Sequence, residues 1–386
     1  MSSVKAAPSR SFTGRTMAGF SAVGRMDGVL LVAVAALAVI GTMLVWSSTR
    51  TWAPGATGLV KKHILNLVIG AVLAGATTMV DYRALRSYAP LVYVVSLVGL
   101  FLVITPLGST VNGAHSWIML GGGFAFQPSE FAKFGLVMML AMLLAKPAAD
   151  TDRPRGMDVW IALVIAAFTM GLVMFQPDFG TTMVLGVITA GAIVIAGIRK
   201  RWIGGLTLSV LGAAAAVWFL NVLEPYQIAR FTAFLNPASD PRGVGYNSTQ
   251  SLIAIGSGEL FGKGLFHGGQ TTGRFVPEQH TDFIFTVAGE EFGFLGSVTV
   301  VALLGVILMR GVRIAQGCDD RFGTLVAGGI VCWLAFQSFI NIGMTVGIMP
   351  ITGLPLPFVS YGGTATFANM IAIGLLQAIH IRQHQF

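Results

Sequence analysis

Long apolar runs dominate the sequence and constrain the fold more than any other feature. Ten runs of roughly 20 residues can be read along the chain, and about 20 apolar residues in a helix span the hydrocarbon core of a bilayer. Inside lipid each backbone N–H and C=O needs a partner within the protein, which favours helices. The sequence therefore predicts an all-α polytopic membrane protein with about ten transmembrane helices. The predicted spans are 29–46, 64–80, 89–105, 130–146, 159–175, 180–198, 202–222, 284–308, 323–348 and 363–383.

The composition agrees with one membrane domain. Only 10% of the 386 residues are charged, whereas a soluble domain carries about a quarter. Residues 1–28 are polar and basic, without a visible signal-peptide cleavage site, and are predicted to be a disordered cytoplasmic tail. Residues 29–386 are predicted to form a single transmembrane domain. The two cysteines, Cys318 and Cys332, argue against a disulfide framework.

The distribution of Lys and Arg predicts the orientation in the membrane. Of the 24 such residues, sixteen fall in segments on the side of the N-terminus and seven on the other side. Cytoplasmic loops carry the excess of positive charge, so both termini are predicted to be cytoplasmic. The basic excess (sequence pI near 9.8) is thus explained by topology, and no nucleic-acid partner is expected.

The same orientation places a large loop, 223–283, outside the cytoplasm between helices 7 and 8. Loops of this length are usually functional or disordered. Two stretches within it, 226–235 and 249–262, have the composition of short amphipathic helices at the membrane interface.

Polar residues gather in five stretches on this outer side. Ionisable groups at membrane depth are costly and usually mark a pathway or a site. The stretches predict one polar cavity that faces outward. They read "STVNGAHSW" (109–117), "FQPSEFAK" (126–133), "FQPDFGTT" (175–182), "PEQHTDF" (277–283) and "LPLPFVSYGG" (354–363).

Several of these residues also have purely structural explanations. Glu130 and Lys133 are three residues apart, so they share a helix face and can pair with each other. Trp117 suits the aromatic belt at the membrane interface. Asp178 follows the proline of the second "FQP" and can cap the next span.

The acidic stretch 277–291 also leaves alternatives open. Asp282 precedes an apolar run and can act as a helix N-cap, and His280 can be a metal ligand or an ordinary loop histidine. Glu290 and Glu291 lie about two turns deeper and point away from Asp282 on a helix, so packing or polar pairing is expected of them.

The sequence lacks the short motifs of several common enzyme classes. It contains no HExxH, Walker A loop, GxSxG elbow or CxxC pair. The glycine-rich run 262–269 lacks the strand–helix context of a nucleotide site. No organic cofactor is expected.

Two motifs give a specific resemblance. "PEQHTDFIFTVAGEEFGFLG" and "LPLPFVSYGG" resemble the strongest motifs of the SEDS family of peptidoglycan glycosyltransferases (RodA, FtsW and SpoVE), and the similarity extends from Asp27 to Arg382. The "PEQHTDF" wording and the short C-terminal tail are more similar to the elongation branch, RodA, than to the division branch, FtsW. Ser116 departs from the family, which often has Arg or Lys before this tryptophan.

The resemblance implies a reaction and a set of site residues. Family members polymerise lipid II into β-1,4-linked glycan strands in the bacterial cell membrane, release undecaprenyl pyrophosphate, and work with a class B penicillin-binding protein. Asp282 matches the essential loop aspartate and is the expected general base, with a pKa raised by the adjoining apolar helix end. A divalent cation such as Mg²⁺ is a further expectation. The expected substrate-binding residues are Trp117, Glu130, Lys133, Arg230, Arg242, Lys263, Arg274, His280, Ser360 and Tyr361.

Two other functions remain open from the sequence. A flippase or transporter for lipid-linked sugars would also use buried charges and broken helices, but it predicts charges deep within several spans. A non-catalytic scaffold for a partner enzyme is the third hypothesis.

Overall fold

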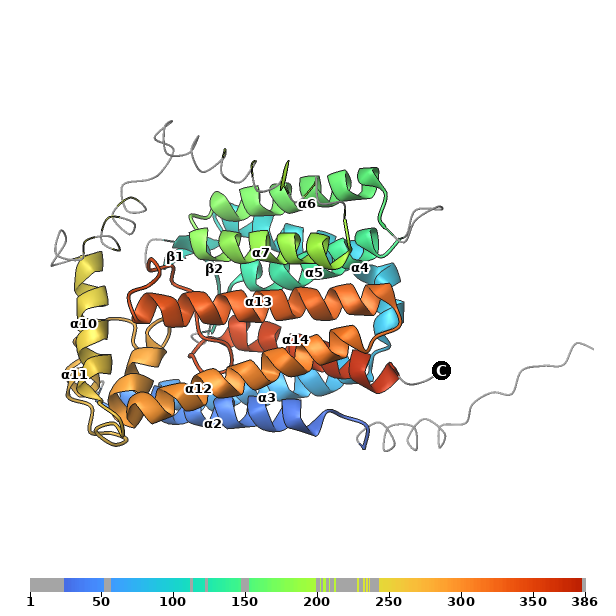
Figure 1. Ribbon diagram of the computed structural model, residues 1–386. Helices are drawn as coiled ribbons and strands as arrows, with labels where there is room; N and C mark the ends of the chain where they lie inside the picture. Colours follow the sequence, from blue (N-terminus) through green and yellow to red (C-terminus); the bar gives the residue numbers. More distant parts are fainter. Residues whose placement is uncertain are drawn as a thin grey trace, which may run out of the picture.

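The protein is a bundle of long helices that run side by side, shown here as a computed structural model (Figure 1). The structure describes residues 24–51, 57–111, 114–121, 124–146, 153–198 and 243–383, and single positions between 202 and 236. The described helices are α2 (Gly28–Thr49), α3 (Thr57–Met79), α4 (Tyr82–Ile104), α5 (Pro128–Leu144), α6 (Gly156–Met174), α7 (Phe179–Ile195), α10 (Val244–Ser257), α11 (Gly269–Gly273), α12 (Ile284–Gln316), α13 (Arg321–Thr345) and α14 (Gly363–Arg382). The strands are β1 (Gly108–Val111), β2 (Ala114–Gly121) and β3 (Phe124–Phe126).

Most of the predicted spans coincide with helices. Nine of the ten predicted runs contain a described helix, and the tenth, 202–222, lies largely outside the described residues. Among the described helices seven are long and apolar enough to cross a membrane, namely α2, α3, α4, α6, α12, α13 and α14. The chain is therefore a helical, multi-pass membrane protein, while the count of ten spans stays a prediction.

Aspartates start four of the described helices. Each carboxylate accepts a hydrogen bond from a backbone N–H of the first turn, which has no partner within the helix. The pairs are Asp27 with Leu30 (α2), Asp81 with Arg83 (α4), Asp178 with Thr181 (α7) and Asp320 with Gly323 (α13). The cap at Asp81 explains why α4 starts seven residues before the predicted 89, with Pro90 inside the helix. The cap predicted for Asp178 is confirmed.

The all-α expectation needs one correction. Strands β1, β2 and β3 lie in a region that was expected to be irregular, and they form a three-stranded antiparallel sheet in the order β1-β2-β3 (Figure 1). Gly108 pairs with Ile118, and Ile118 pairs with Phe126 on the other side. Antiparallel pairing satisfies backbone groups that an irregular segment beside a membrane would leave without partners.

Helix α12 was expected as one continuous span over 284–308, but it is broken at Gly293. This glycine has φ 65° and ψ −160°, outside the helical region. The segment 259–262 crosses at the break, where Phe294 N donates to Glu259 O (2.9 Å) and Leu295 N to Leu260 O (3.1 Å). A Cβ at position 293 would collide with the backbone of Leu260 and Gly262, so glycine allows this close approach.

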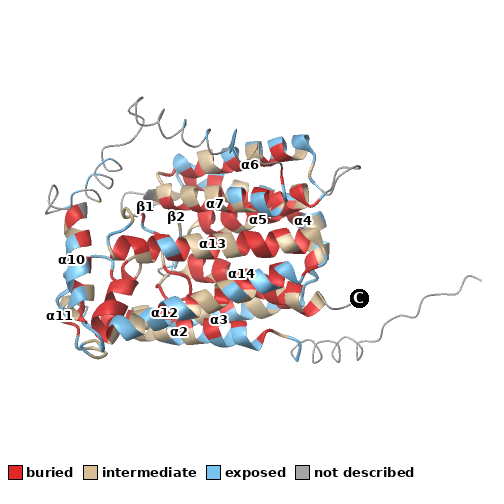
Figure 2. Cartoon of the chain, in the orientation of Figure 1, coloured by how far each residue is buried: buried red, intermediate tan, exposed pale blue. Residues whose placement is uncertain are grey.

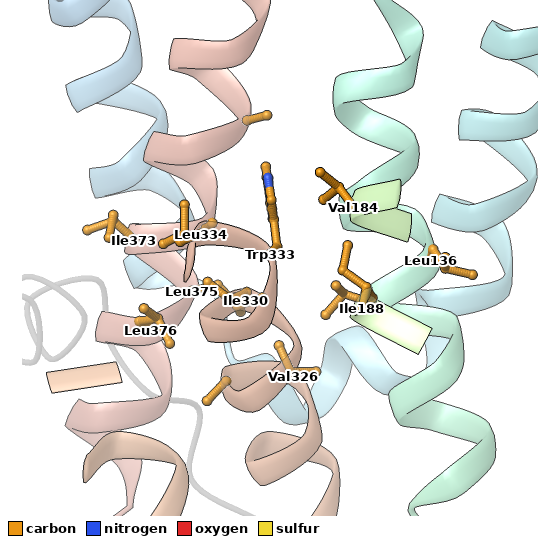
Figure 3. Close-up of a cluster of buried hydrophobic side chains, with 14 of the residues drawn as sticks. Leu136, Val184, Ile188, Val326, Ile330, Trp333, Leu334, Ile373, Leu375 and Leu376 are labelled. Carbon is orange, nitrogen blue, oxygen red and sulfur yellow. The ribbon is translucent and has the colours of Figure 1, made fainter. Parts of the chain in front are cut away.

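The core runs along the length of the bundle and is mostly apolar, although buried charged residues such as Glu130 and Lys133 lie within it. Figure 2 shows buried residues on the inner faces of α13, α14 and α5 and exposed ones on the outer faces of α6 and α12. Figure 3 shows Trp333 lying between the leucines and isoleucines of α14 and the Val184 and Ile188 side chains of α7. The exposed apolar residues of the outer helix faces, such as Phe294 and Val298, are those expected to meet lipid.

The first and last described helices are joined at one end. Asp27 N donates to Gln377 Oε1 (2.9 Å), and Gln377 Nε2 donates to Asp27 O (3.0 Å). Arg310 of α12 forms an ion pair with the Asp27 carboxylate at 2.5 Å. Asp27 is buried, so these contacts satisfy both its backbone and its charge.

The two ends of the bundle differ in character. Helices α10 and α11 and strands β1 and β2 gather at one end, and the C-terminus lies at the other (Figure 1). Helix α10 overlaps the second predicted amphipathic segment, 249–262, while most of the first, 226–235, falls outside the described residues. The candidate site lies at the α10 end, below called the outer-loop end.

Candidate functional site

Asp282 lies in the loop that leads into α12. The helix starts at Ile284 with Phe283 at the cap position, so Asp282 lies one residue before the N-cap position suggested for it. The side chain is half-buried. The loop that contains Gly353 passes beside this side chain: a Cβ placed on Gly353 would lie 3.4 Å from Asp282 Oδ2. Gly353 has φ +75°, a conformation that favours glycine.

The two motifs that carry the family resemblance meet here. Tyr361 N donates to His280 O at 2.9 Å, and the centroids of the two rings are 5.7 Å apart. The ring of buried His63, on α3, follows at 6.1 Å from Tyr361. Each loop also holds a non-glycine residue at positive φ, Glu278 (51°) and Phe358 (66°), a strained conformation that is common at functional sites.

Burial changes the ionisation of this pair of rings. It lowers the pKa of His280, against an opposing effect of the Glu278 charge, and it raises the pKa of Tyr361. Both groups are therefore neutral at pH 7. Ser360 is buried as well, and its Oγ accepts from Leu356 N (2.8 Å), so in this structure the hydroxyl is engaged in holding its own turn.

The lowered pKa of His280 predicts acid sensitivity. Below the ordinary histidine pKa of about 6.5, the unfolded chain binds a proton at His280 that the folded protein does not. The free energy of unfolding therefore decreases as the pH is lowered. We expect His280→Gln to lose less thermal stability than the parent protein between pH 7 and pH 5. Melting curves in detergent at both pH values measure the difference, and equal losses would contradict the prediction.

The predicted Glu130–Lys133 pair is present and buried. Lys133 Nζ lies 2.7 Å from Glu130 Oε1, with the two side chains 0% and 2% exposed. The same ammonium group donates to Gln337 Oε1 (2.9 Å) and lies 4.8 Å from the centre of the Trp333 ring. In this structure the Lys133 charge is therefore paired within the bundle, and a contact with substrate stays a prediction.

The two "FQP" segments come together at the same end. Asp178 Oδ2 accepts from Gln127 Nε2 and from Ser129 Oγ, both at 3.3 Å. Gln127 N also donates to Thr364 Oγ1 at the start of α14 (3.2 Å). Pro128 occupies the first turn of α5, which confirms that this motif starts a helix. The starts of α5, α7 and α14 are thus held in one polar cluster.

The acidic residues of α12 organise the outer loop, as expected of Glu290 and Glu291. Glu290 is fully buried and accepts from Lys263 Nζ (3.2 Å), from the backbone N–H groups of Gln270 and Thr271 (both 2.8 Å) and from Thr271 Oγ1 (2.7 Å). Glu291 accepts from Ser47 Oγ of α2. Neither carboxylate belongs to the Asp282 loop.

The expected cations have different environments. Lys263 is paired with Glu290 but keeps a side chain 37% exposed. Arg274 is exposed and donates to the Thr51 carbonyl. Arg230 and Arg242 fall outside the described residues. Trp117 is half-buried on β2, paired in register with Ser109, also at the outer-loop end.

Among the described residues no group of three or more His, Cys, Asp or Glu side chains could hold a metal ion by itself. Mg²⁺ often binds through only one or two carboxylates together with water and substrate phosphates. The divalent cation therefore stays an expectation from the resemblance, and no step proposed below runs through it.

Gln337 and His63 are two of the polar side chains near the site that were missed from the sequence. Gln337 was read as part of an apolar span, although an amide at membrane depth is itself a signal. His63 was overlooked because it falls just before the predicted start of its span at 64. Its two ring nitrogens have no hydrogen-bond partner among the described residues, which is unusual for a buried polar group.

Fold and site together define a class: a multi-pass helical membrane protein with a polar site where its loops meet at one end of the bundle. Comparison with known proteins then places it in a family. A sequence model of the FtsW, RodA and SpoVE family, described as "Cell cycle protein", matches residues 28–385. The chain belongs to this family.

Individual relatives cover nearly the whole chain. Peptidoglycan glycosyltransferase MrdB of Escherichia coli K12 is 36% identical over 92% of this chain and 93% of its own length. Stage V sporulation protein E of Bacillus subtilis strain 168 is 37% identical over 91% of this chain and 95% of its own.

Two solved structures are also similar to this chain over nearly its whole length. A chain from a peptidoglycan synthase complex, described as coordinating polymerization and crosslinking, matches with a TM-score of 0.79 and 31% identity, over 94% of this chain and 99% of that one. The rod shape determining protein RodA of Thermus thermophilus matches with a TM-score of 0.69 and 29% identity, over 94% of this chain and 98% of that one.

Proposed function

We propose that this protein is a peptidoglycan glycosyltransferase that polymerises lipid II. The observation that carries the proposal is the meeting of the loops 277–283 and 350–362 at the outer-loop end, where the half-buried Asp282 lies beside Gly353, two residues after His280 of the His280–Tyr361 ring pair. Relatives named peptidoglycan glycosyltransferases match over nine-tenths of the chain. A carboxylate held beside a membrane can serve a substrate whose sugar is in water and whose tail is in lipid.

In the proposed reaction Asp282 is the general base. The 4-hydroxyl of the acceptor GlcNAc attacks the anomeric carbon of the lipid-linked donor, and its proton passes to the Asp282 carboxylate. The new C–O bond forms as the bond from the anomeric carbon to the pyrophosphate oxygen breaks. One displacement inverts the α donor linkage into the β-1,4 product.

The leaving pyrophosphate gains negative charge and needs cations nearby. Lys263 and Arg274 are the exposed described cations of the outer loop. Lys263 is paired with Glu290 of α12, and Arg274 donates to the carbonyl of Thr51, just after α2. We assign them this role, together with Arg230 and Arg242 of the same loop. Trp117, His280 and Tyr361 are proposed to line the sugar-binding part of the site.

Polymer formation by the purified protein tests the proposal. Labelled lipid II is incubated with the protein in detergent, and the products are separated on a gel. The control is Asp282→Asn prepared in the same way, which reports any contaminating polymerase. Polymer with the parent protein alone supports the proposal. Transfer of lipid II across vesicle membranes without polymer would instead support the flippase hypothesis.

We also propose an elongation role, an orientation with both termini in the cytoplasm, and a large extracytoplasmic loop over 223–283. The elongation role rests on the "PEQHTDF" motif. Its test is whether this protein rescues rod shape in cells depleted of their elongation polymerase. Rescue of division instead would assign the FtsW-type role.

The orientation predicts a labelling pattern. In a variant without Cys318 and Cys332, Thr272→Cys should react with an impermeant thiol reagent in intact cells, because 272 is exposed at the outer-loop end. Asp319→Cys, exposed between α12 and α13, should react only after lysis. The reverse pattern would overturn the orientation.

A class B penicillin-binding protein is the proposed partner, because a transpeptidase must reach nascent glycan outside the cell. The matched synthase complex is described as joining polymerization to crosslinking, which supports a partner of this kind. Photocrosslinkers on the exposed faces of α12 and α13, at Val298 and Phe339, should capture it. Failure at every exposed position of both helices would count against this surface.

A further inference from the structure

Asn341 of α13 holds both loops of the site with one amide group. Its Nδ2 donates to Asp282 O and to Leu354 O, both at 2.7 Å. The side chain is fully buried. An amide NH₂ has two N–H donors, and here each of them is used on a different loop.

Gln337 repeats the arrangement one helical turn away. Its Nε2 donates to Pro355 O (2.8 Å), the carbonyl next to the one that Asn341 holds. Its Oε1 accepts from Lys133 Nζ (2.9 Å) and from Trp333 Nε1 (2.7 Å). Residues four apart lie on one helix face, so α13 presents a row of amides to the loop 350–358.

The physical reason for such a row is the irregular backbone at this depth. Carbonyls of the two loops lie outside any helix or sheet, and a buried carbonyl without a partner is costly. The amides supply fixed donors from a rigid helix. A carboxylate that takes a proton in the reaction needs a fixed position, because displacement by about 1 Å can cost up to about 10²-fold in rate.

We propose that Asn341 is a positioning residue for Asp282. It fixes the backbone of the residue that carries the carboxylate and ties it to the loop that passes beside that carboxylate. Gln337 extends this hydrogen-bonded line to the buried Glu130–Lys133 pair. The inference rests on the proposed function, since it assigns Asp282 the reacting carboxylate.

Asn341→Leu is the test variant, because leucine keeps the branched shape and removes both donors. We expect the kcat for lipid II polymerisation to fall at least ~10-fold while KM changes less than ~2-fold, since the base is misplaced but substrate contacts remain. Ser338→Ala is the matched control: Ser338 is buried on the same helix, and its hydroxyl has no hydrogen-bond partner among the described residues. It should keep the parent rate.

A double variant separates positioning from a general loss of structure. If Asn341 acts through Asp282, adding Asn341→Leu to Asp282→Asn should lower the polymerisation rate by less than a further ~3-fold. Two results would overturn the proposal. One is a loss of rate in the double variant equal to the product of the losses in the two single variants, and the other is a raised KM with unchanged kcat in Asn341→Leu. If Asn341→Leu does not fold, Asn341→Ala, which admits water to the two carbonyls, is measured in the same cycle.

Hydrogen exchange keeps this test independent of the proposed function. In Asn341→Leu, peptides covering 277–283 and 350–358 should exchange faster than in Ser338→Ala, with the rest of the protein unchanged. Should the parent protein fail to polymerise lipid II, the proposed function fails, and the exchange result alone decides whether Asn341 ties the loops. Unchanged exchange in both loops would overturn the tie itself.

Discussion

Replacing Asp282 by asparagine is expected to lower the rate of polymerisation at least ~10²-fold, while the protein stays folded and able to bind lipid II. Asparagine keeps the size and polarity of the side chain but cannot take up the proton of the attacking hydroxyl. Position 282 lies one residue before Phe283, the N-cap of α12, and asparagine caps a helix as well as aspartate does. The melting temperature should therefore barely change. Initial rates from the gel assay and melting curves measure the two quantities.

Glu278→Gln is the control for this prediction. Glu278 is in the same loop and is exposed, and one of its carboxylate oxygens lies 3.1 Å from Thr281 Oγ1. We expect this variant to keep most of the activity. Near-normal polymerisation by Asp282→Asn, together with loss in Glu278→Gln or in a His280 variant, would transfer the role of the base to that residue.

Lys133→Ala is expected to have the second large effect, on stability first and on activity as a result. The substitution leaves the Glu130 carboxylate buried without its cation, and removing one partner of a buried pair costs on the order of 3–5 kcal/mol. It also leaves Gln337 Oε1 without one of its two donors. The melting temperature in detergent and the yield of membrane-inserted protein measure the loss. Full stability and activity would show that the pair is dispensable.

The double variant Glu130→Gln, Lys133→Met removes both charges and keeps the side-chain volumes. Replacement of a whole buried pair is often close to neutral for stability. We expect the double variant to recover much of the stability lost in Lys133→Met alone. If activity recovers with it, the pair is structural, as its burial indicates. If stability recovers and activity does not, Lys133 acts in the reaction as well.

The helices could be predicted from hydropathy because each apolar run has to pair its own backbone inside lipid. The starts of helices were less accurate. Helix α3 starts at Thr57, seven residues before the predicted start at 64. The prediction was late because it assigned Lys61 and Lys62 to a loop, although charged side chains at a helix end can reach the interface. The sheet of β1, β2 and β3 depends on hydrogen bonds between neighbouring strands, and the break at Gly293 depends on the segment 259–262; a hydropathy window records neither kind of contact.

The site was predicted at the level of motifs rather than of contacts. The acidic loop and the "LPLPFVSYGG" stretch were both identified, and the backbone bond from Tyr361 to His280 brings them together. The sequence could not show that Glu290 holds Lys263, since those residues are 27 positions apart and meet only through the fold. Gln337 and Asn341 were hidden because single amides barely change the mean hydropathy of a span.

The joint between Asp27 and Gln377 has a consequence for how the chain is made. These residues are 350 positions apart, so at about 5–20 residues per second the ribosome needs on the order of 20–70 s to supply the second one. During that interval α2 is already synthesised, but the backbone of Asp27 still lacks its Gln377 partner. A nascent chain that ends before α14 can never close this joint. The contact therefore forms only once α14 has been made, and a product truncated before α14 would leave the start of α2 without this partner.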